Sequence, residues 1–263
     1  MSIPIYQVDS FTGKPFKGNP AGVCVLEEPG ETQWMQNMAK EMNLSETAFL
    51  YKLKDSYNLR WFTPKVEVEM CGHATLASAH ILWSEKYESE NSELRFHSLS
   101  GILKAKMLDG WIELDFPQRP QEQVEAPPGL LEALGVKAIY VGKNKFDFFV
   151  EVSSANEVRA LSPDFRMLRE FNVRGVIVTA KSDLPEYDFV SRFFAPGAGI
   201  DEDPVTGSAH CCLAPYWSQK IGKKEMVAYQ ASERGGVVKV RLTGDRVYLM
   251  GKSVTIFKGE LTI

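Results

Sequence analysis

The sequence predicts an α+β fold built from two similar halves. Three observations support this prediction: short motifs recur about half a chain apart, each half has one long apolar segment that begins at a glycine, and each half ends in a hairpin-like pattern. The 263 residues, of which 44% are hydrophobic and 24% charged, are enough to form two medium-sized domains.

The repeat is clearest in two pairs of motifs. RWFTP at residues 60–64 returns as RFFAP at 192–196, and GHA at 72–74 returns as GSA at 207–209. A regular spacing between similar motifs is the signature of a repeated structural unit. We therefore expect each half to fold in the same way.

A Pro-, Gln- and Glu-rich stretch over residues 118–129 separates the halves and is the predicted linker, although a surface loop would have the same composition. The predicted domains are residues 1–117 and residues 118–263. The chain's final strand is allowed to return to the first of them.

Within each half the pattern predicts short strands, one central helix and a closing hairpin. The helices should cover about residues 72–85 and 207–220, where Ala, Leu and Ile on all sides indicate burial against strands. The hairpins should cover about residues 100–116 and 235–250.

Composition excludes several classes of function. The formal net charge is −4, from 30 basic and 34 acidic residues that are mixed along the chain, so nothing suggests a nucleic-acid partner. No apolar run approaches the roughly 18 residues that cross a bilayer, and the first residues lack the pattern of a signal peptide. We expect a cytoplasmic protein with no membrane partner, whose four cysteines are reduced.

The two helix starts predict anion binding. A helix that begins at a glycine offers free backbone N–H groups and the positive end of its dipole, so Gly72 and Gly207 are candidate binding residues for a carboxylate. For one such glycine, close helix packing is the simpler explanation. Two at matched positions favour a site for a small carboxylate-bearing molecule, with Ser208 beside the second glycine.

Glu46 is the candidate proton carrier. It lies among apolar residues in LSETAFL, where loss of solvent would raise the pKa of a carboxyl group towards neutrality and suit it to proton transfer. Its counterpart in the repeat is Gly175, so only the first half carries this acid. The alternative is an exposed glutamate at a strand edge, or a helix-capping acid.

Two further residues are candidates for the same chemistry. His73 lies in the first turn of a helix, where the dipole favours the neutral imidazole, and it should orient the substrate or the acid. Asp203 lies in a segment three residues longer than its counterpart in the first half, and it could equally cap or order that turn.

Cofactors are not expected. His80, His97 and His210 form no metal-binding spacing with one another or with cysteines, and no phosphate-binding glycine motif is present. The sequence therefore predicts neither a metal nor a nucleotide cofactor.

Five motifs together resemble the PhzF-like family of phenazine-biosynthesis isomerases. They are FKGNPAGVCVL at 16–26, NLSETAFL at 43–50, RWFTP with MCGHATLASAH over 60–80, DEDPVTGSAH at 201–210 and QASERGG at 230–236. They follow the order of the family and span nearly the whole chain.

This resemblance implies a diaminopimelate epimerase-like fold, in which two pseudo-symmetric domains each wrap a bent, mostly antiparallel sheet or barrel around a central helix, and a homodimer. It implies that Glu46 is the catalytic acid/base, that His73, Asp203 and Ser208 surround the substrate, and that Asn19 lines the site. The family's name-giving reaction moves a proton between two carbons of a dihydro-hydroxyanthranilate without a metal or cofactor.

Other activities remain open. Related proline racemases and diaminopimelate epimerases use two thiols, but only Cys71 matches, because the second position is Thr206 and Cys211 lies about one helical turn too far along. Cys71 with Thr206 resembles hydroxyproline dehydratases, which are the alternative enzyme. A small-molecule binding protein without turnover is the alternative from another class.

Overall fold

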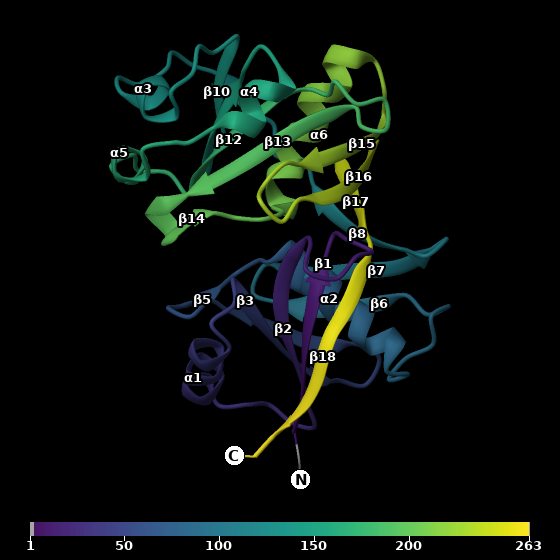
Figure 1. Ribbon diagram of the computed structural model, residues 1–263. Coiled ribbons are helices and arrows are strands. Elements are labelled where there is room, and N and C mark those ends of the chain that lie inside the picture. The colour runs from purple at the N-terminus through teal and green to yellow at the C-terminus, as the bar shows by residue number, and fades with distance from the viewer. Residues whose placement is uncertain (1–2, 263) are drawn as a thin grey trace. The chain divides into compact units, whose positions relative to one another are not determined.

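The computed structural model describes residues 3–262 and divides them into two compact units (Figure 1). Unit 1 comprises the described residues up to Phe116 together with those from Tyr248 onwards, and unit 2 comprises Pro117–Val247. The boundary at 116/117 lies next to the predicted one at 117/118. The described residues from Tyr248 onwards belong to unit 1, whereas the predicted second domain includes all of them except a returning final strand.

Unit 1 is a mixed sheet with two helices. Its elements are β1 (Ile3–Ser10), β2 (Asn19–Leu26), α1 (Thr32–Met42), β3 (Glu46–Lys52), β4 (Tyr57–Phe62), β5 (Glu67–Val68), α2 (Gly72–Ser84), β6 (Leu94–Ser98), β7 (Gly101–Leu108), β8 (Trp111–Pro117) and β18 (Ser253–Leu261). Most neighbouring strands are antiparallel, whereas β3 runs parallel to β2 and β6 runs parallel to β4.

Helix α2 is the centre of unit 1. Every residue from His73 to Ala79 is buried, and the helix packs on β1, β2, β3 and β18. A helix that is apolar all round is stable only when other elements surround it. The C-terminal strand β18 also packs on this helix and pairs with β1 (Figure 1). Thr255 Oγ1 of β18 lies 3.0 Å from Nε2 of His80 in α2.

Unit 2 repeats this plan with additional helices. Its elements are β9 (Glu122–Gln123), α3 (Leu130–Leu134), β10 (Tyr140–Lys143), β11 (Asp147–Glu151), α4 (Ala155–Ala160), α5 (Phe165–Arg169), β12 (Gly175–Lys181), β13 (Phe189–Ala195), η1 (Pro196–Ala198), β14 (Ile200–Glu202), α6 (Gly207–Ile221), β15 (Glu225–Gln230) and β16 (Gly236–Thr243), and β17 (Arg246–Gly251) crosses the boundary. The predicted linker is not a free segment, because β9 pairs with β10 inside unit 2.

The strand senses of the two units agree element by element. β12 runs parallel to β11 as β3 does to β2, β13 is antiparallel to β12 as β4 is to β3, and β15 runs parallel to β13 as β6 does to β4. The internal repeat expected from the motifs is therefore a repeat of topology.

The arginines of the RWFTP and RFFAP motifs make the same ion pair in the two units. Arg60 binds Glu67 through Nε and Nη2, each 2.7 Å from a carboxylate oxygen, and Arg192 binds Glu202 with the same two distances. In each unit the arginine joins the strand that carries the motif to the short strand that follows, and such two-pronged pairs fix geometry better than a single bond.

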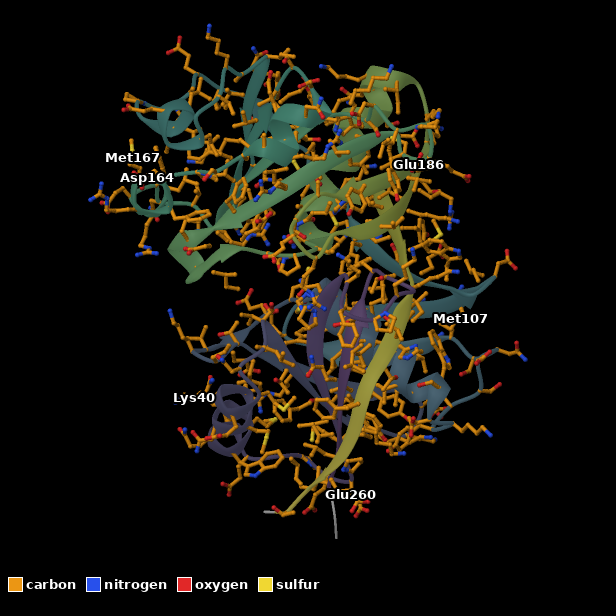
Figure 2. All side chains as sticks on the ribbon, viewed as in Figure 1. Lys40, Met107, Asp164, Met167, Glu186 and Glu260 are labelled. Atoms are coloured by element: carbon orange, nitrogen blue, oxygen red, sulfur yellow. The ribbon has the colours of Figure 1, made fainter. Side chains whose placement is uncertain are left out.

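The surface carries charges of both signs. Lys40 and Glu260 in unit 1 and Glu186 in unit 2 are exposed, and their labelled side chains point away from the ribbon (Figure 2). Over residues 3–262, no helix has the length and apolar character to span a bilayer.

Candidate active site

Three element starts meet in unit 1. Asn19 begins β2, Glu46 begins the parallel strand β3, and His73 is the second residue of α2. Parallel strands have their first residues at the same edge of a sheet, and α2 starts beside that edge. His73 Nε2 lies 3.3 Å from Glu46 Oε2, and His73 Nδ1 lies 3.2 Å from Asn19 Nδ2.

These contacts identify the protonated nitrogen of His73. The Asn19 amide nitrogen can only donate a hydrogen bond, so His73 Nδ1 accepts it and the ring hydrogen resides on Nε2. Nε2 therefore lies beside the Glu46 carboxylate without a well-formed hydrogen bond to it. The contact is less directional than a good hydrogen bond, as is common before a ligand tightens an active site.

His73 is held in its neutral form. Its side chain is 6% exposed, and burial lowers its pKa to about 3. Ser10 Oγ donates a hydrogen bond of 2.8 Å to the His73 carbonyl, which anchors the first turn of α2 to β1. At neutral pH the imidazole can donate from Nε2 but takes up no proton.

A metal could be held by three of these residues. Glu46, Cys71 and His73 offer ligand atoms within 4.8 Å of one another. However, Cys71 Sγ lies 3.5 Å from His73 Nδ1, whereas Glu46 lies beside Nε2, so the thiol and the carboxylate approach opposite nitrogens of the ring. A metal bound by all three would require a rearrangement, and the absence of a metal stays a prediction.

The matching corner of unit 2 is organised around Asp203. Thr206 Oγ1 donates to Asp203 Oδ2 at 2.6 Å, and Gln230 joins the same turn by accepting from Thr206 N at 2.9 Å and donating to the Asp203 carbonyl at 2.7 Å. Asp203 thus orders the turn before α6, which is the structural role that the sequence left open for it. Its substrate role stays a prediction.

Ser208 is the second residue of α6, as His73 is of α2. Arg174 Nη1 donates to Ser208 Oγ at 2.8 Å, while Arg174 Nε donates to Asp147 Oδ1 at 2.8 Å and Nη2 donates to Asp147 Oδ2. Sequence reasoning missed Arg174, Asp147 and Gln230. Arg174 had a usable signal, because it immediately precedes Gly175, the counterpart of Glu46.

Comparisons with known proteins agree with this architecture. The family model described as phenazine biosynthesis-like protein matches residues 8–259. An uncharacterized isomerase of Halalkalibacterium halodurans is 53% identical, with both chains covered completely. A crystal structure of a PhzF family protein from Enterococcus faecalis is 42% identical with a TM-score of 0.95, again covering both chains completely.

The chain belongs to the PhzF-like family. A probable proline racemase from Agrobacterium radiobacter, 11% identical with a TM-score of 0.66 over 99% of this chain and 93% of that one, shares the fold, so the expected epimerase-like fold class is confirmed. Three relatives of this chain that match it over at least 99% of their length are described as uncharacterized isomerases, so the expected enzyme class, an isomerase, is confirmed as well.

Only one half of this PhzF-like chain can carry an acid at the Glu46 position. Glu46 and Gly175 each begin the corresponding strand. A Cβ added to Gly175 would lie 2.4 Å from Phe193 Cζ and 2.7 Å from the Phe194 carbonyl oxygen, closer than real Cβ contacts. The asymmetry noted in the sequence therefore has a steric cause.

The thiols do not form the pair that a two-thiol racemase needs. Cys71 and Thr206 are the residues immediately before α2 and α6, so the position matched to Cys71 holds a hydroxyl group. Cys211 and Cys212 lie inside α6, where burial raises the pKa of each to about 12. Neither is suited to act as a thiolate near neutral pH.

Proposed function

We propose that this PhzF-like isomerase moves a proton between two carbons of a small carboxylate-bearing metabolite, without a metal or cofactor, and that Glu46 carries the proton. The observation that supports this most directly is the contact of the Glu46 carboxylate with the neutral His73 imidazole, where Glu46 is 15% exposed and His73 6%.

The chemistry follows from the acid–base character of the two groups. Ionised Glu46 takes a proton from a substrate carbon adjacent to a conjugated system, and the electron pair of that C–H bond moves into the conjugation. The Glu46 carboxyl group then returns a proton to a different carbon, so atoms and electrons balance without a co-reactant. His73 retains its own proton and steadies the carboxylate through Nε2–H.

Substrate binding is assigned to the remaining predicted residues. In this proposal Gly72 and Gly207 offer backbone N–H groups, and Asp203 and Ser208 contact polar groups of the substrate. Among the described residues, neither Cys71 nor Thr206 caps its helix with a side-chain hydrogen bond, which leaves first-turn N–H groups for a ligand.

The substrate class is expected to include dihydro-hydroxyanthranilate-like acids, since the matching family is described as phenazine biosynthesis-like. A homodimer and a cytoplasmic location are part of the same proposal. Light scattering of the purified protein would test the dimer.

The decisive experiment is proton NMR in D₂O with dihydro-hydroxyanthranilate and a panel of small amino and hydroxy acids. Wild type and the exposed-site control Glu28→Gln should exchange a carbon-bound proton or isomerise a substrate, and Glu46→Gln should do neither while still binding it. Exchange that survives in Glu46→Gln would contradict the proposal. Binding without exchange in wild type would favour the non-catalytic alternative.

A dehydratase is the second candidate, because Cys71 Sγ lies within the same cluster, 3.5 Å from His73 Nδ1. In that reaction one base removes a proton and a hydroxide leaves. Including trans-3-hydroxyproline in the panel, with Cys71→Ser beside wild type, separates the candidates, because its hydroxyl is on the carbon next to the one that loses the proton. A dehydratase loses its activity with the thiol, whereas the proposed isomerase keeps it.

A further inference from the structure

Arg174 lies beside the unit 2 counterpart of the catalytic corner in unit 1. It directly precedes Gly175, which matches Glu46, and it contacts Ser208, which matches His73. Unit 1 thus has a carboxylate and a neutral imidazole at this corner, and unit 2 has a guanidinium and a hydroxyl. The two corners have different chemistry on the same scaffold.

Arg174 is fixed in place from several directions. Asp147, which is 1% exposed, binds its Nε and Nη2 edge. The guanidinium carbon lies 5.2 Å from the centre of the Phe193 ring and 5.7 Å from that of Phe146. Burial alone would lower the pKa of Arg174, but the hydrogen bonds and charge of Asp147 raise it above the ordinary value, so the group is a permanent cation.

The contact with Ser208 determines which way the serine hydroxyl can act. Arg174 has N–H donors and no acceptor, so Ser208 Oγ accepts from it at 2.8 Å. The hydroxyl hydrogen of Ser208 is then directed to another acceptor. A hydroxyl held in this way discriminates in favour of a ligand group that only accepts hydrogen bonds, such as a carboxylate.

A simpler account is that Arg174 only neutralises the buried Asp147. That role uses the Nε and Nη2 edge and leaves Nη1 without a required partner. In the structure Nη1 is bonded to Ser208, and the Arg174 side chain is 33% exposed, so the arginine joins a buried ion pair to an accessible hydroxyl. Charge neutralisation alone does not explain that third bond.

We propose that Arg174 is a positioning residue that orients the Ser208 hydroxyl to donate a hydrogen bond to a carboxylate oxygen of the substrate. This inference rests on the proposed function and deepens it, because it assigns recognition of the substrate carboxylate to Ser208 and its support to Arg174. Arg174 acts through Ser208, so its effect should disappear when Ser208 cannot donate.

The test compares two ligands that differ in one group. Anthranilate (2-aminobenzoate) carries a carboxylate, and 2-aminobenzamide carries an uncharged amide on the same ring. Dissociation constants are measured by fluorescence titration or calorimetry. Wild type and the exposed control Arg166→Lys should prefer anthranilate. Ser208→Ala should weaken anthranilate binding by about tenfold or more and amide binding by clearly less, because a hydrogen bond to the charged carboxylate is stronger than one to the neutral amide carbonyl.

Arg174→Lys keeps a cation beside Asp147 but loses the planar fork that reaches Ser208. It should weaken anthranilate binding like Ser208→Ala, and the double variant Arg174→Lys/Ser208→Ala should bind as Ser208→Ala does. If Arg174→Lys fails to fold, the double variant Arg174→Gln/Asp147→Asn is used in its place. This double variant removes both charges of the ion pair, so no buried charge is left uncompensated.

Three results would overturn the inference: no preference of wild type for anthranilate, wild-type selectivity in the Arg174 variants, or fully additive effects in the double variant. Glu46→Gln separates this inference from the proposed function. It should retain wild-type affinity for anthranilate while losing deuterium exchange, so a failure of catalysis leaves the binding comparison intact.

Discussion

Burial of His73 as a neutral imidazole predicts a specific pH dependence of stability. Burial lowers the pKa of His73 to about 3 in the folded protein, while the unfolded chain has the ordinary value of 6.5. The unfolded state therefore binds a proton more readily. The stability that His73 contributes is complete above about pH 6.5, declines as the pH falls, and levels off below about pH 3.

The size of the effect between pH 7 and pH 5 follows from these two values. At pH 5 the unfolded imidazole is almost fully protonated and the folded one is almost fully neutral, so the free energy of unfolding falls by about 2 kcal/mol over this interval. His210, which is completely buried and whose pKa is lowered to about 4, should contribute a similar decrease. Both folded-state pKa values lie below pH 5, so the loss of unfolding free energy between pH 7 and pH 5 depends mainly on the histidine pKa in the unfolded chain.

The assay is urea unfolding of wild type and His73→Asn at pH 7 and pH 5. His73→Asn should cost stability at both pH values because it alters packing, but that cost is independent of pH. Its loss of unfolding free energy between the two pH values should be smaller than that of wild type by about 2 kcal/mol. His97→Asn, at an exposed site in β6, is the matched control and should keep the wild-type difference.

An equal pH dependence in His73→Asn and wild type would refute the reasoning, because it would mean that His73 is already protonated or exposed in the folded state. The same experiment bears on catalysis. A His73 that stays neutral down to pH 5 cannot produce a pH–rate change near its ordinary pKa, so an acid limb in that region would have to come from another group.

Three further predictions concern the site and its support. Nitrogen-15 NMR of histidine-labelled protein should find His73 protonated at Nε2, and Asn19→Ala should disturb this tautomer and lower kcat more than it raises KM. Cys71→Ser should retain the proton-transfer rate within about threefold, because the position that matches Cys71 holds the hydroxyl of Thr206, so a two-thiol mechanism is not available. Glu202→Gln should lower the free energy of unfolding by about 3 kcal/mol by leaving its arginine partner partly uncompensated, while the exposed Glu225→Gln should change it by less than about 0.5 kcal/mol in the same urea titration.

Much of the fold was accessible from the sequence. The α2 and α6 starts at Gly72 and Gly207 were predicted correctly, and their ends lie within one residue of the predicted ones. These helices could be predicted because their apolar residues and the glycine at each start are signals that extend over only a few neighbouring residues. Residues 118–129 were harder, since their Pro- and Glu-rich composition is compatible with a loop, a linker or the short edge strand that the structure contains.

The candidate residues of unit 1 lie together in the structure. Glu46 and His73 are predicted from their sequence context and Asn19 from the family resemblance, and β2, β3 and α2 place the three at one corner. Their chemical roles remain predictions. Arg174 had one signal in the sequence, its place directly before the counterpart of Glu46, but its ion pair with Asp147, 27 residues away, has no local pattern that distinguishes it from surface charges.

The sequence by itself determined the repeat, the two glycine-initiated helices and the presence of an acid at the Glu46 position in only one half, since each depends on residue type and spacing. Only the tertiary structure decided that β18 returns to unit 1, that the Asn19 amide meets His73 Nδ1, and that Arg174 donates a hydrogen bond to Ser208. These features depend on the direction of hydrogen bonds between residues far apart in the chain. A one-dimensional pattern records which groups can donate or accept, but the packed fold determines which of them meet.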